Sequence, residues 1–160
     1  MDTWWIDKPK LMGSKNPTDA DLESLRVEGF GVLVSLLCEK KETPRYNIAR
    51  ATVLGYIRHN IAVEDLCPPT VKQLERFVKL INGFPPGTKT IIHCEGGTGR
   101  TGTFAVAYWI TKCMTVADAL VHVRKARPLA VETLEQEAIL QEFVSTIQTQ
   151  LLDAQIENRR

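Results

Sequence analysis

Cys94 and Arg100 are separated by five residues, and three of those five are glycine. Glycine has no Cβ, so successive backbone N–H groups of such a segment can turn toward one centre without steric cost. A centre lined by N–H groups binds an anion, and a guanidinium can hold two oxygens of one phosphate. The spacing predicts a phosphate-binding loop after Cys94, whose contributing residues are Glu95, Gly96, Gly97, Thr98, Gly99 and Arg100.

The elements on either side of this loop strengthen the prediction. The apolar residues 91–92 indicate a strand before Cys94, and the apolar run from Gly102 indicates a buried helix after the loop. The N-terminus of that helix adds unpaired N–H groups and a positive dipole end. A cysteine in such a field is expected to be a thiolate, which is a nucleophile. We therefore expect Cys94 to attack phosphorus while Arg100 and the loop amides stabilise the oxygens.

The segment His93-Cys94-x-x-Gly97-x-x-Arg100-Thr101 resembles the signature of the cysteine-dependent protein tyrosine phosphatase superfamily. A nucleotide-binding P-loop is a poor fit, because Arg stands where that motif has Lys. The resemblance extends over about residues 31–143, and the short chain is more similar to the small dual-specificity phosphatases than to the classical tyrosine-specific enzymes. It implies hydrolysis of phosphotyrosine, phosphoserine and phosphothreonine through a cysteinyl-phosphate, with no metal or other cofactor.

The departing oxygen of a phosphate ester needs a proton, which a carboxylic acid on a loop can supply. Asp65 follows a predicted strand and precedes Pro68 and Pro69. This place matches the general-acid position that the resemblance implies. Glu64 is the alternative acid, and a third interpretation makes both side chains solvated loop residues.

Three further residues receive a role or a choice of roles. His93 is expected to fix the loop backbone rather than to transfer protons. The Thr101 hydroxyl either donates a hydrogen bond to the departing thiolate or caps the helix. The resemblance implies that Gln136 orients the hydrolytic water, whereas Thr133 with Gln136 also forms the pattern of a capping box.

Alternating strand and helix patterns predict the elements that position these residues. The fold class is α/β, a single domain over residues 1–160 with a central mixed, mostly parallel sheet flanked by helices and a polar tail from about residue 153. Strands are predicted at residues 4–6, 11–13, 31–38, 56–61 and 89–93, and helices at 19–28, 47–54, 70–82, 102–114, 115–127 and 132–151. Trp4 and Trp5 are expected to cover the sheet edge.

Two polar segments allow alternatives. Arg45, Tyr46 and Arg50 either touch substrate or form a solvated face, and the solvated face is favoured. The basic cluster of residues 124–127 also has two interpretations, a solvated face or support of the phosphate loop. There a solvated face is again favoured over support of the loop, which the similarity of the Val-Arg-x-x-Arg-Pro stretch to the family suggests.

The formal net charge of +1 gives no support for a nucleic-acid or anionic-membrane partner. The sequence shows neither a signal peptide nor an apolar run of membrane-spanning length, so a cytoplasmic protein is expected. The cysteines form no C-x-x-C pair, which favours reduced thiols. Cys38, Cys67 and Cys113 are expected to be packed, with a redox partnership between Cys67 and Cys94 as the alternative. We expect a monomer whose partners are phosphorylated proteins.

Three other functions compete with a protein phosphatase, and one of them is that of other Cys-loop-Arg enzymes, such as sulfur-transfer or arsenate-reducing proteins. A phosphotyrosine-binding module without turnover would be marked by loss of Cys94, Arg100 or the acid, and none is lost. A phosphatase for a non-protein phosphate ester is the third alternative. Phosphoinositide and RNA 5′-triphosphate substrates favour additional cations, but residues 95–99 include no lysine.

Overall fold

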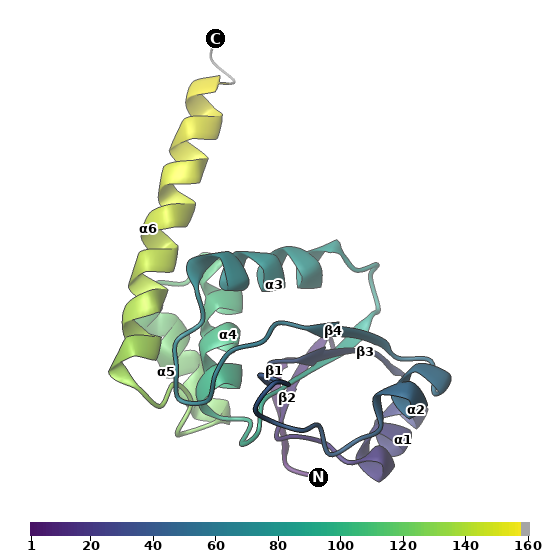
Figure 1. Ribbon diagram of the computed structural model, residues 1–160. Helices are drawn as coiled ribbons and strands as arrows, with labels where there is room; N and C mark the ends of the chain where they lie inside the picture. Colours follow the sequence, from purple (N-terminus) through teal and green to yellow (C-terminus); the bar gives the residue numbers. More distant parts are fainter. Residues whose placement is uncertain (158–160) are drawn as a thin grey trace.

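The computed structural model describes the backbone of residues 1–157 and the side chains of residues 1–150. A five-stranded sheet lies at its centre, in the order β1-β2-β5-β3-β4. The first strand is antiparallel to the second, and the other neighbours are parallel. The predicted α/β class with a mixed, mostly parallel sheet is confirmed (Figure 1). The strands are β1 Thr3–Asp7, β2 Leu11–Ser14, β3 Phe30–Ser35, β4 Ile57–Asn60 and β5 Lys89–His93.

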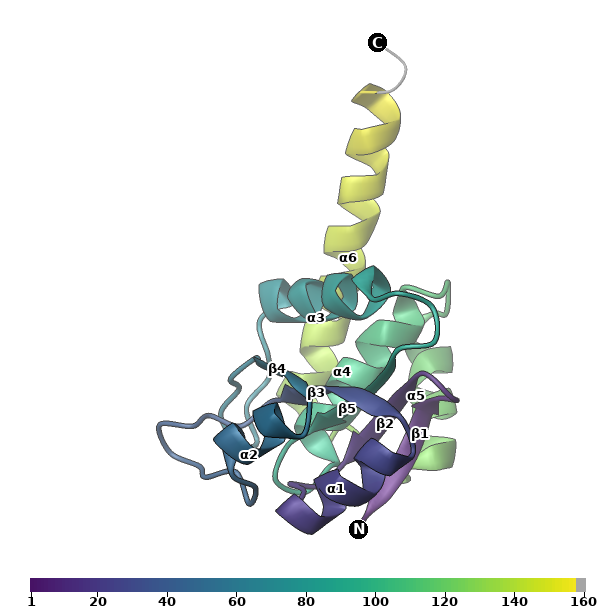
Figure 2. The same ribbon diagram turned by 90° about the vertical axis from the view of Figure 1, so that its right-hand side faces the viewer.

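Helices cover both faces of the sheet, and each face has its own apolar core. One face packs against α1 and α2, and the other against α3, α4, α5 and α6 (Figures 1 and 2). The helices are α1 Asp19–Val27, α2 Ile48–Val53, α3 Val71–Gly83, α4 Gly99–Ile110, α5 Val116–Ala126 and α6 Leu134–Glu157. The central strand β5 therefore ends between two packed layers, which fixes the position of the loop that follows it.

Alternation along the two inner strands divides their side chains between the cores. Leu33 and Ile91 face α1 and α2. Val34 and Ile92 face the larger group of helices, where the rings of Phe77 and Phe104 meet edge to face at 5.2 Å. Burying such side chains contributes about 1.5–3 kcal/mol each relative to exposure. This packing holds α4 against the sheet.

Three expected boundaries were wrong. The strand β3 ends at Ser35 rather than at Cys38, and the Asn60 side chain donates to the carbonyls of Ser35 and Leu37 at this end. The helix α4 runs over Gly99–Ile110 instead of 102–114. It stops there because Cys113 takes a left-handed φ of 68°.

Two cysteine predictions fail with these boundaries. The Cys113 side chain is exposed and Cys38 is only half-buried, so neither is the packed apolar residue that was expected. An apolar neighbour in the sequence does not bury a thiol when the chain turns at that residue.

The last helix also differs from its prediction. The helix α6 continues to Glu157, so the predicted polar tail is helical over residues 153–157, and residues 158–160 lie outside the described part. Figure 2 shows the end of α6 projecting beyond the other helices.

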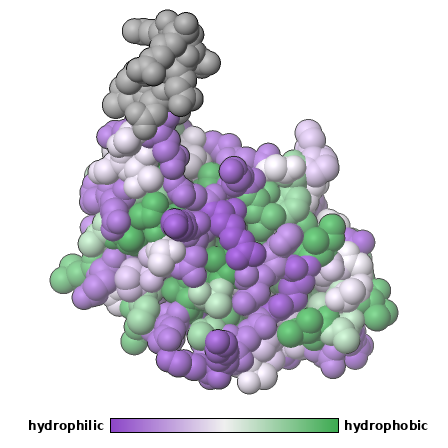
Figure 3. Space-filling view, turned by 45° about the horizontal axis from the view of Figure 1, so that its top comes forward, coloured by the Kyte–Doolittle hydropathy of each residue, from purple (hydrophilic) through white to green (hydrophobic). Residues whose placement is uncertain are grey.

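The outer surface is mixed in character. Figure 3 shows small hydrophobic groups separated by hydrophilic residues on one face of the molecule. Among the described residues, no helix combines the length and the apolar character needed to cross a membrane.

Candidate active site

Cys94 lies at the carboxyl end of β5 and is 2% exposed. Its Sγ atom accepts a hydrogen bond of 3.2 Å from the backbone N–H of Gly97 and one of 3.1 Å from Thr101 Oγ1. Both donors stabilise negative charge on sulfur. Thr101 thus takes the first of its two expected places, facing the thiol. The helix has no side-chain cap hydrogen bond at its N-cap residue, Thr98.

The loop backbone depends on glycine at one position. Gly97 has a φ of 70°, and a Cβ atom there would lie 2.5 Å from the backbone nitrogen of Lys15. Only glycine fits such a left-handed, closely packed position without strain. The close approach of Lys15, just after β2, fixes the loop from outside.

Arg100 is 1% exposed, and its guanidinium is held by three neighbours. Nη1 donates to Glu42 Oε2 at 2.7 Å and to the Val63 carbonyl at 2.9 Å, and Nη2 donates to Glu42 Oε1 and Asp65 Oδ1, both at 2.8 Å. Nε is buried and has no hydrogen-bond partner among the described residues. A phosphate oxygen would satisfy this donor.

The charges around Arg100 shift the pKa values of Arg100 and of Glu42. Burial alone lowers the pKa of Arg100, but its hydrogen bond to Glu42 and the negative charges of Cys94 and Asp65 outweigh burial and raise that pKa above its ordinary value. The hydrogen bond from Arg100 lowers the pKa of Glu42 in turn. Both groups are therefore ionised at neutral pH.

Glu42 is a site residue that the sequence analysis missed. It lies in the polar segment between β3 and α2, where the sequence analysis considered only Arg45 and Tyr46 as substrate contacts. A usable signal existed, because the carboxyl ends of neighbouring parallel strands meet at one edge of the sheet. An acid shortly after β3 therefore belongs among the candidates for contact with a loop that follows β5.

The two competing acids have different surroundings. Asp65 Oδ1 binds Arg100 directly, whereas Glu64 Oε1 pairs with Lys41 Nζ at 2.8 Å on the surface. The Asp65 side chain is 61% exposed, so its carboxyl group is accessible to a leaving group or to a water molecule with which it could exchange a proton. The geometry brings Asp65, and not Glu64, to the guanidinium.

His93 is fully buried beside the nucleophile. Burial of the imidazole lowers the pKa of His93 to about 3, so the ring is neutral. Nδ1 lies 3.4 Å from the carbonyl of Cys94, and Nε2 lies 3.2 Å from the hydroxyl of Tyr46. A carbonyl only accepts, so this network assigns the proton to Nδ1 and makes Tyr46 the donor to Nε2. The His93 ring thus contacts the loop backbone at the carbonyl of Cys94.

Tyr46 corrects the interpretation of its segment as a solvated face. Its ring is 4% exposed, and its oxygen accepts a hydrogen bond of 2.8 Å from Arg58 Nε. Arg45 binds the Glu95 side chain at 2.5 Å, and Arg50 pairs with Glu23 on the surface. Tyr46 and Arg45 therefore contact the phosphate loop or its support, while Arg50 does not.

Gln136 connects α6 to the acid loop. Its Oε1 atom accepts from the Glu132 backbone N–H at 2.9 Å, and its Nε2 atom donates to the Cys67 carbonyl at 3.3 Å. Its own N–H donates to Thr133 Oγ1 at 3.1 Å. The cap is thus present, with Glu132 in place of Thr133 as the backbone donor. The Cys67 side chain is exposed, against the packing expected for it.

Within the basic cluster, Arg127 supports the loop, which was the less favoured alternative. Arg127 Nη2 donates to the carbonyl of Gly96 at 3.0 Å and to Thr98 Oγ1 at 3.2 Å. Its guanidinium also makes a bidentate pair with Asp2 at 2.9 and 3.1 Å. Arg124 donates to the Ala130 carbonyl at 3.1 Å.

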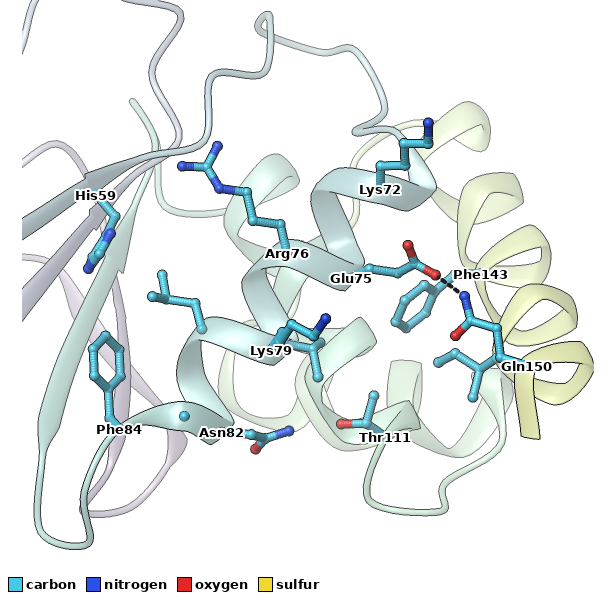
Figure 4. A pocket seen from close by; sticks show the side chains of 14 residues that line it. His59, Lys72, Glu75, Arg76, Lys79, Asn82, Phe84, Thr111, Phe143 and Gln150 are labelled. Carbon is cyan, nitrogen blue, oxygen red and sulfur yellow. Dashed lines mark hydrogen bonds between the residues drawn. The ribbon is translucent and has the colours of Figure 1, made fainter. Parts of the chain in front are cut away.

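A cavity of about 930 Å³ lies elsewhere, among β4, α3 and α6. Figure 4 shows His59, Arg76 and Phe143 around it. None of its lining residues belongs to the phosphate loop or the acid loop. Cys94, Arg100 and Asp65 all lie outside this cavity.

A family model described as "Polymorphic toxin system, DSP-PTPase phosphatase" matches residues 9–114, a range that includes Asp65, Cys94 and Arg100. The chain is also similar to a solved structure of Tk-PTP in the active form. The TM-score is 0.81 and the identity is 30%, covering 89% of this chain and 96% of that one.

Two curated relatives point to different substrates. Phosphatidylglycerophosphate phosphatase PTPMT2 of Arabidopsis thaliana is 29% identical over 158 residues, covering 94% of this chain and 67% of the plant protein. Tyrosine-protein phosphatase 1 of Schizosaccharomyces pombe is 31% identical over 97 residues. That match covers 51% of this chain and 18% of the yeast protein.

Proposed function

Because the chain belongs to the DSP-PTPase phosphatases, we propose that it hydrolyses phosphomonoesters of proteins, phosphotyrosine above all, through a cysteinyl-phosphate intermediate. The observation that carries this proposal is the meeting of three groups at one loop. Cys94 Sγ accepts two hydrogen bonds, and Asp65 lies 2.8 Å from the Arg100 guanidinium. The buried Nε of Arg100 has no hydrogen-bond partner in the part of the chain that the structure describes.

In the first step the thiolate of Cys94 attacks phosphorus. An S–P bond forms as the P–O ester bond breaks, and the departing oxygen takes a proton from Asp65. Arg100 and the loop amides stabilise the charge on the three remaining phosphate oxygens.

In the second step the Asp65 carboxylate takes a proton from water. The water oxygen bonds to phosphorus while the S–P bond breaks, which releases inorganic phosphate and restores both residues to their starting states. Thr101 donates its hydrogen bond to the sulfur as the thiolate departs. Gln136 holds the acid loop by its bond to the Cys67 carbonyl, and we infer that its action on the water is indirect.

Acidic side chains around the loop favour a phosphoprotein over a polyanionic headgroup. Glu95 follows the nucleophile, and its carboxylate is bound by Arg45. Glu42 and Asp65 occupy the Nη donors of Arg100. A substrate with a second phosphate would meet these carboxylates, and the resulting repulsion discriminates against it.

A lipid phosphomonoester is the second candidate function. The plant relative that is 29% identical is named a phosphatidylglycerophosphate phosphatase, and it matches nearly the whole of this chain. The chemistry at Cys94 and Arg100 would be the same for both substrate classes, so the choice depends on the rim of the site.

The test compares turnover in EDTA of p-nitrophenyl phosphate, phosphotyrosine, phosphoserine and phosphothreonine peptides, and phosphatidylglycerophosphate in detergent micelles. Cys94→Ser is expected to abolish all turnover, and Cys113→Ser, at an exposed thiol, to leave it unchanged. A higher kcat/KM for phosphotyrosine peptide than for the lipid supports the proposal. The reverse order moves the assignment to the lipid. Turnover that survives Cys94→Ser refutes the mechanism, and binding of phosphopeptide without turnover identifies a recognition module.

A further inference from the structure

The strand β1 reaches the phosphate loop from the edge of the sheet. The indole Nε1 of Trp4 donates a buried hydrogen bond of 3.0 Å to the carbonyl of Gly97. Trp4 is 7% exposed. A Cβ atom at Gly13, on the neighbouring strand, would lie 2.6 Å from the indole ring. The absence of a side chain at Gly13 leaves room for the indole, whose hydrogen bond to the loop means that Trp4 does more than cover the sheet edge.

The carbonyl that Trp4 holds belongs to a planar peptide unit shared with Thr98. In a trans peptide the C=O and N–H groups point in opposite directions. The preceding peptide unit, between Gly96 and Gly97, shows this arrangement. Arg127 holds the Gly96 carbonyl at 3.0 Å, and the Gly97 N–H of the same unit points at Cys94 Sγ at 3.2 Å. A carbonyl bound from outside thus accompanies an N–H directed into the loop.

The carbonyls of Glu95, Gly96 and Gly97 differ in the donors that bind them. The Glu95 carbonyl is bound by a backbone N–H, that of Asn16, at 3.0 Å. The Gly96 carbonyl accepts from Thr98 Oγ1 as well as from Arg127. Among the described residues, the Trp4 indole is the side chain that binds the Gly97 carbonyl.

Loss of this bond has a specific consequence. Gly97 has a φ of 70° and no Cβ, so rotation of the peptide unit after it is sterically cheap. A buried carbonyl without a donor favours such a rotation, because the rotation lets it find another partner. The Thr98 N–H would then leave the direction in which a phosphate oxygen needs it.

We propose that Trp4 is a positioning residue of the active site, which keeps the Gly97–Thr98 peptide unit oriented for phosphate binding. This inference rests on the proposed phosphate-binding role of the loop. The side chain acts through the loop backbone and does not touch substrate. Residues near the start of the sequence therefore help to form a site whose signature begins at His93.

The test replaces the indole by a ring without a donor, Trp4→Phe. The matched control is Trp5→Phe on the same strand, since Trp5 points to the opposite face and stacks on Phe30 at 6.0 Å. Each variant is assayed for thermal unfolding, for kcat/KM with p-nitrophenyl phosphate, and for competitive inhibition by inorganic phosphate. Trp4→Phe is expected to raise the inhibition constant and to lower kcat/KM about tenfold, while Trp5→Phe changes both less than about twofold.

A purely structural Trp4 would give another result. The unfolding midpoint would fall, but phosphate inhibition and kcat/KM below that midpoint would match the wild type, and this outcome overturns the inference. If the wild type neither hydrolyses the ester nor is inhibited by phosphate, the proposed function fails instead.

A second measurement uses the wild-type protein and does not require Trp4→Phe to fold. The indole N–H signals in a ¹H–¹⁵N spectrum are assigned with Trp5→Phe and Trp109→Phe, leaving Trp4 by elimination. Titration with inorganic phosphate is expected to shift the Trp4 signal more than that of Trp5. A Trp4 signal that does not respond, in a protein whose activity phosphate inhibits, contradicts the inference.

Discussion

Glu42 grips the guanidinium of Arg100 with both carboxylate oxygens, at 2.7 and 2.8 Å. Glu42 lies on the loop after β3, and Arg100 lies in the first turn of α4, which follows the parallel neighbour β5. In the sequence, 58 positions separate them. A bidentate pair of this kind fixes the plane of the guanidinium. It thereby sets the direction of the Nε donor, which has no partner within the described side chains of residues 1–150.

Glu42→Gln tests this relationship. An amide offers one acceptor in place of two and turns its NH₂ group toward a donor. We expect kcat/KM for p-nitrophenyl phosphate to fall about tenfold to a hundredfold, the range that corresponds to loss of a charge-assisted hydrogen bond. The control Glu23→Gln breaks an exposed pair with Arg50, and it should change kcat/KM less than about twofold. Equal rates for both variants would show that Arg100 needs no such support.

Asp65→Asn removes the proposed proton donor but keeps its size. With phosphotyrosine peptide, kcat should fall about a hundredfold and the decline of the rate at high pH should disappear, because an amide has no proton to lose. The loss should be smaller with p-nitrophenyl phosphate, whose leaving group is stable as an anion. The pH–rate profiles of the two substrates measure this difference.

Glu64→Gln is the matched control for Asp65→Asn. Its carboxylate pairs with Lys41 on the surface, away from Arg100. The wild-type pH profile should persist in this variant. If Glu64→Gln, rather than Asp65→Asn, removes the decline of the rate at high pH, Glu64 is the proton donor and the assignment of Asp65 is wrong.

The variants Gly97→Ala and Gly96→Ala compare the need for glycine at two positions of the phosphate loop. A methyl group at Gly97 would lie 2.5 Å from the Lys15 nitrogen, on a residue with a φ of 70°. At Gly96 its nearest neighbour would be Thr98 Oγ1 at 3.8 Å, an ordinary contact. We expect Gly97→Ala to lower kcat/KM about a hundredfold, as a displaced catalytic loop does, and Gly96→Ala to lower it by much less. Equal losses measured by steady-state kinetics would contradict this reading of the loop.

His93 should make the stability of the fold depend on pH. Its pKa is about 3 in the folded state, below the ordinary value of 6.5, so the unfolded chain binds a proton that the folded chain does not. The free energy of unfolding therefore falls as pH drops from 6.5 toward 3, by about 1.4 kcal/mol per pH unit once below the upper value.

Urea unfolding between about pH 5 and about pH 6.5 measures this slope, since most carboxyl groups titrate lower. His93→Asn keeps a polar side chain that does not titrate. The slope should be smaller in that variant than in the wild type. Identical slopes would mean that another group carries the pH dependence.

Local signals in the sequence determined much of the architecture. Glycine-rich spacing between Cys94 and Arg100, caps such as Thr70 and Thr115, and apolar runs of strand length depend on residues a few positions apart. The α/β class, the order of elements and the place of the loop after β5 followed from them. In the structure, Thr70 and Thr115 cap α3 and α5 by accepting hydrogen bonds from the backbone N–H groups of Gln73 and Asp118.

Only the tertiary structure decided which distant side chains meet at the loop. Glu42 and Tyr46 lie in a segment whose polarity indicated solvent exposure, and Trp4 lies at the start of an edge strand. Their contacts arise because parallel strands bring their carboxyl ends to one edge and because β1 packs alongside them. Burial and hydrogen bonding between residues 47 to 93 positions apart leave no local pattern, so composition and periodicity could not reveal them.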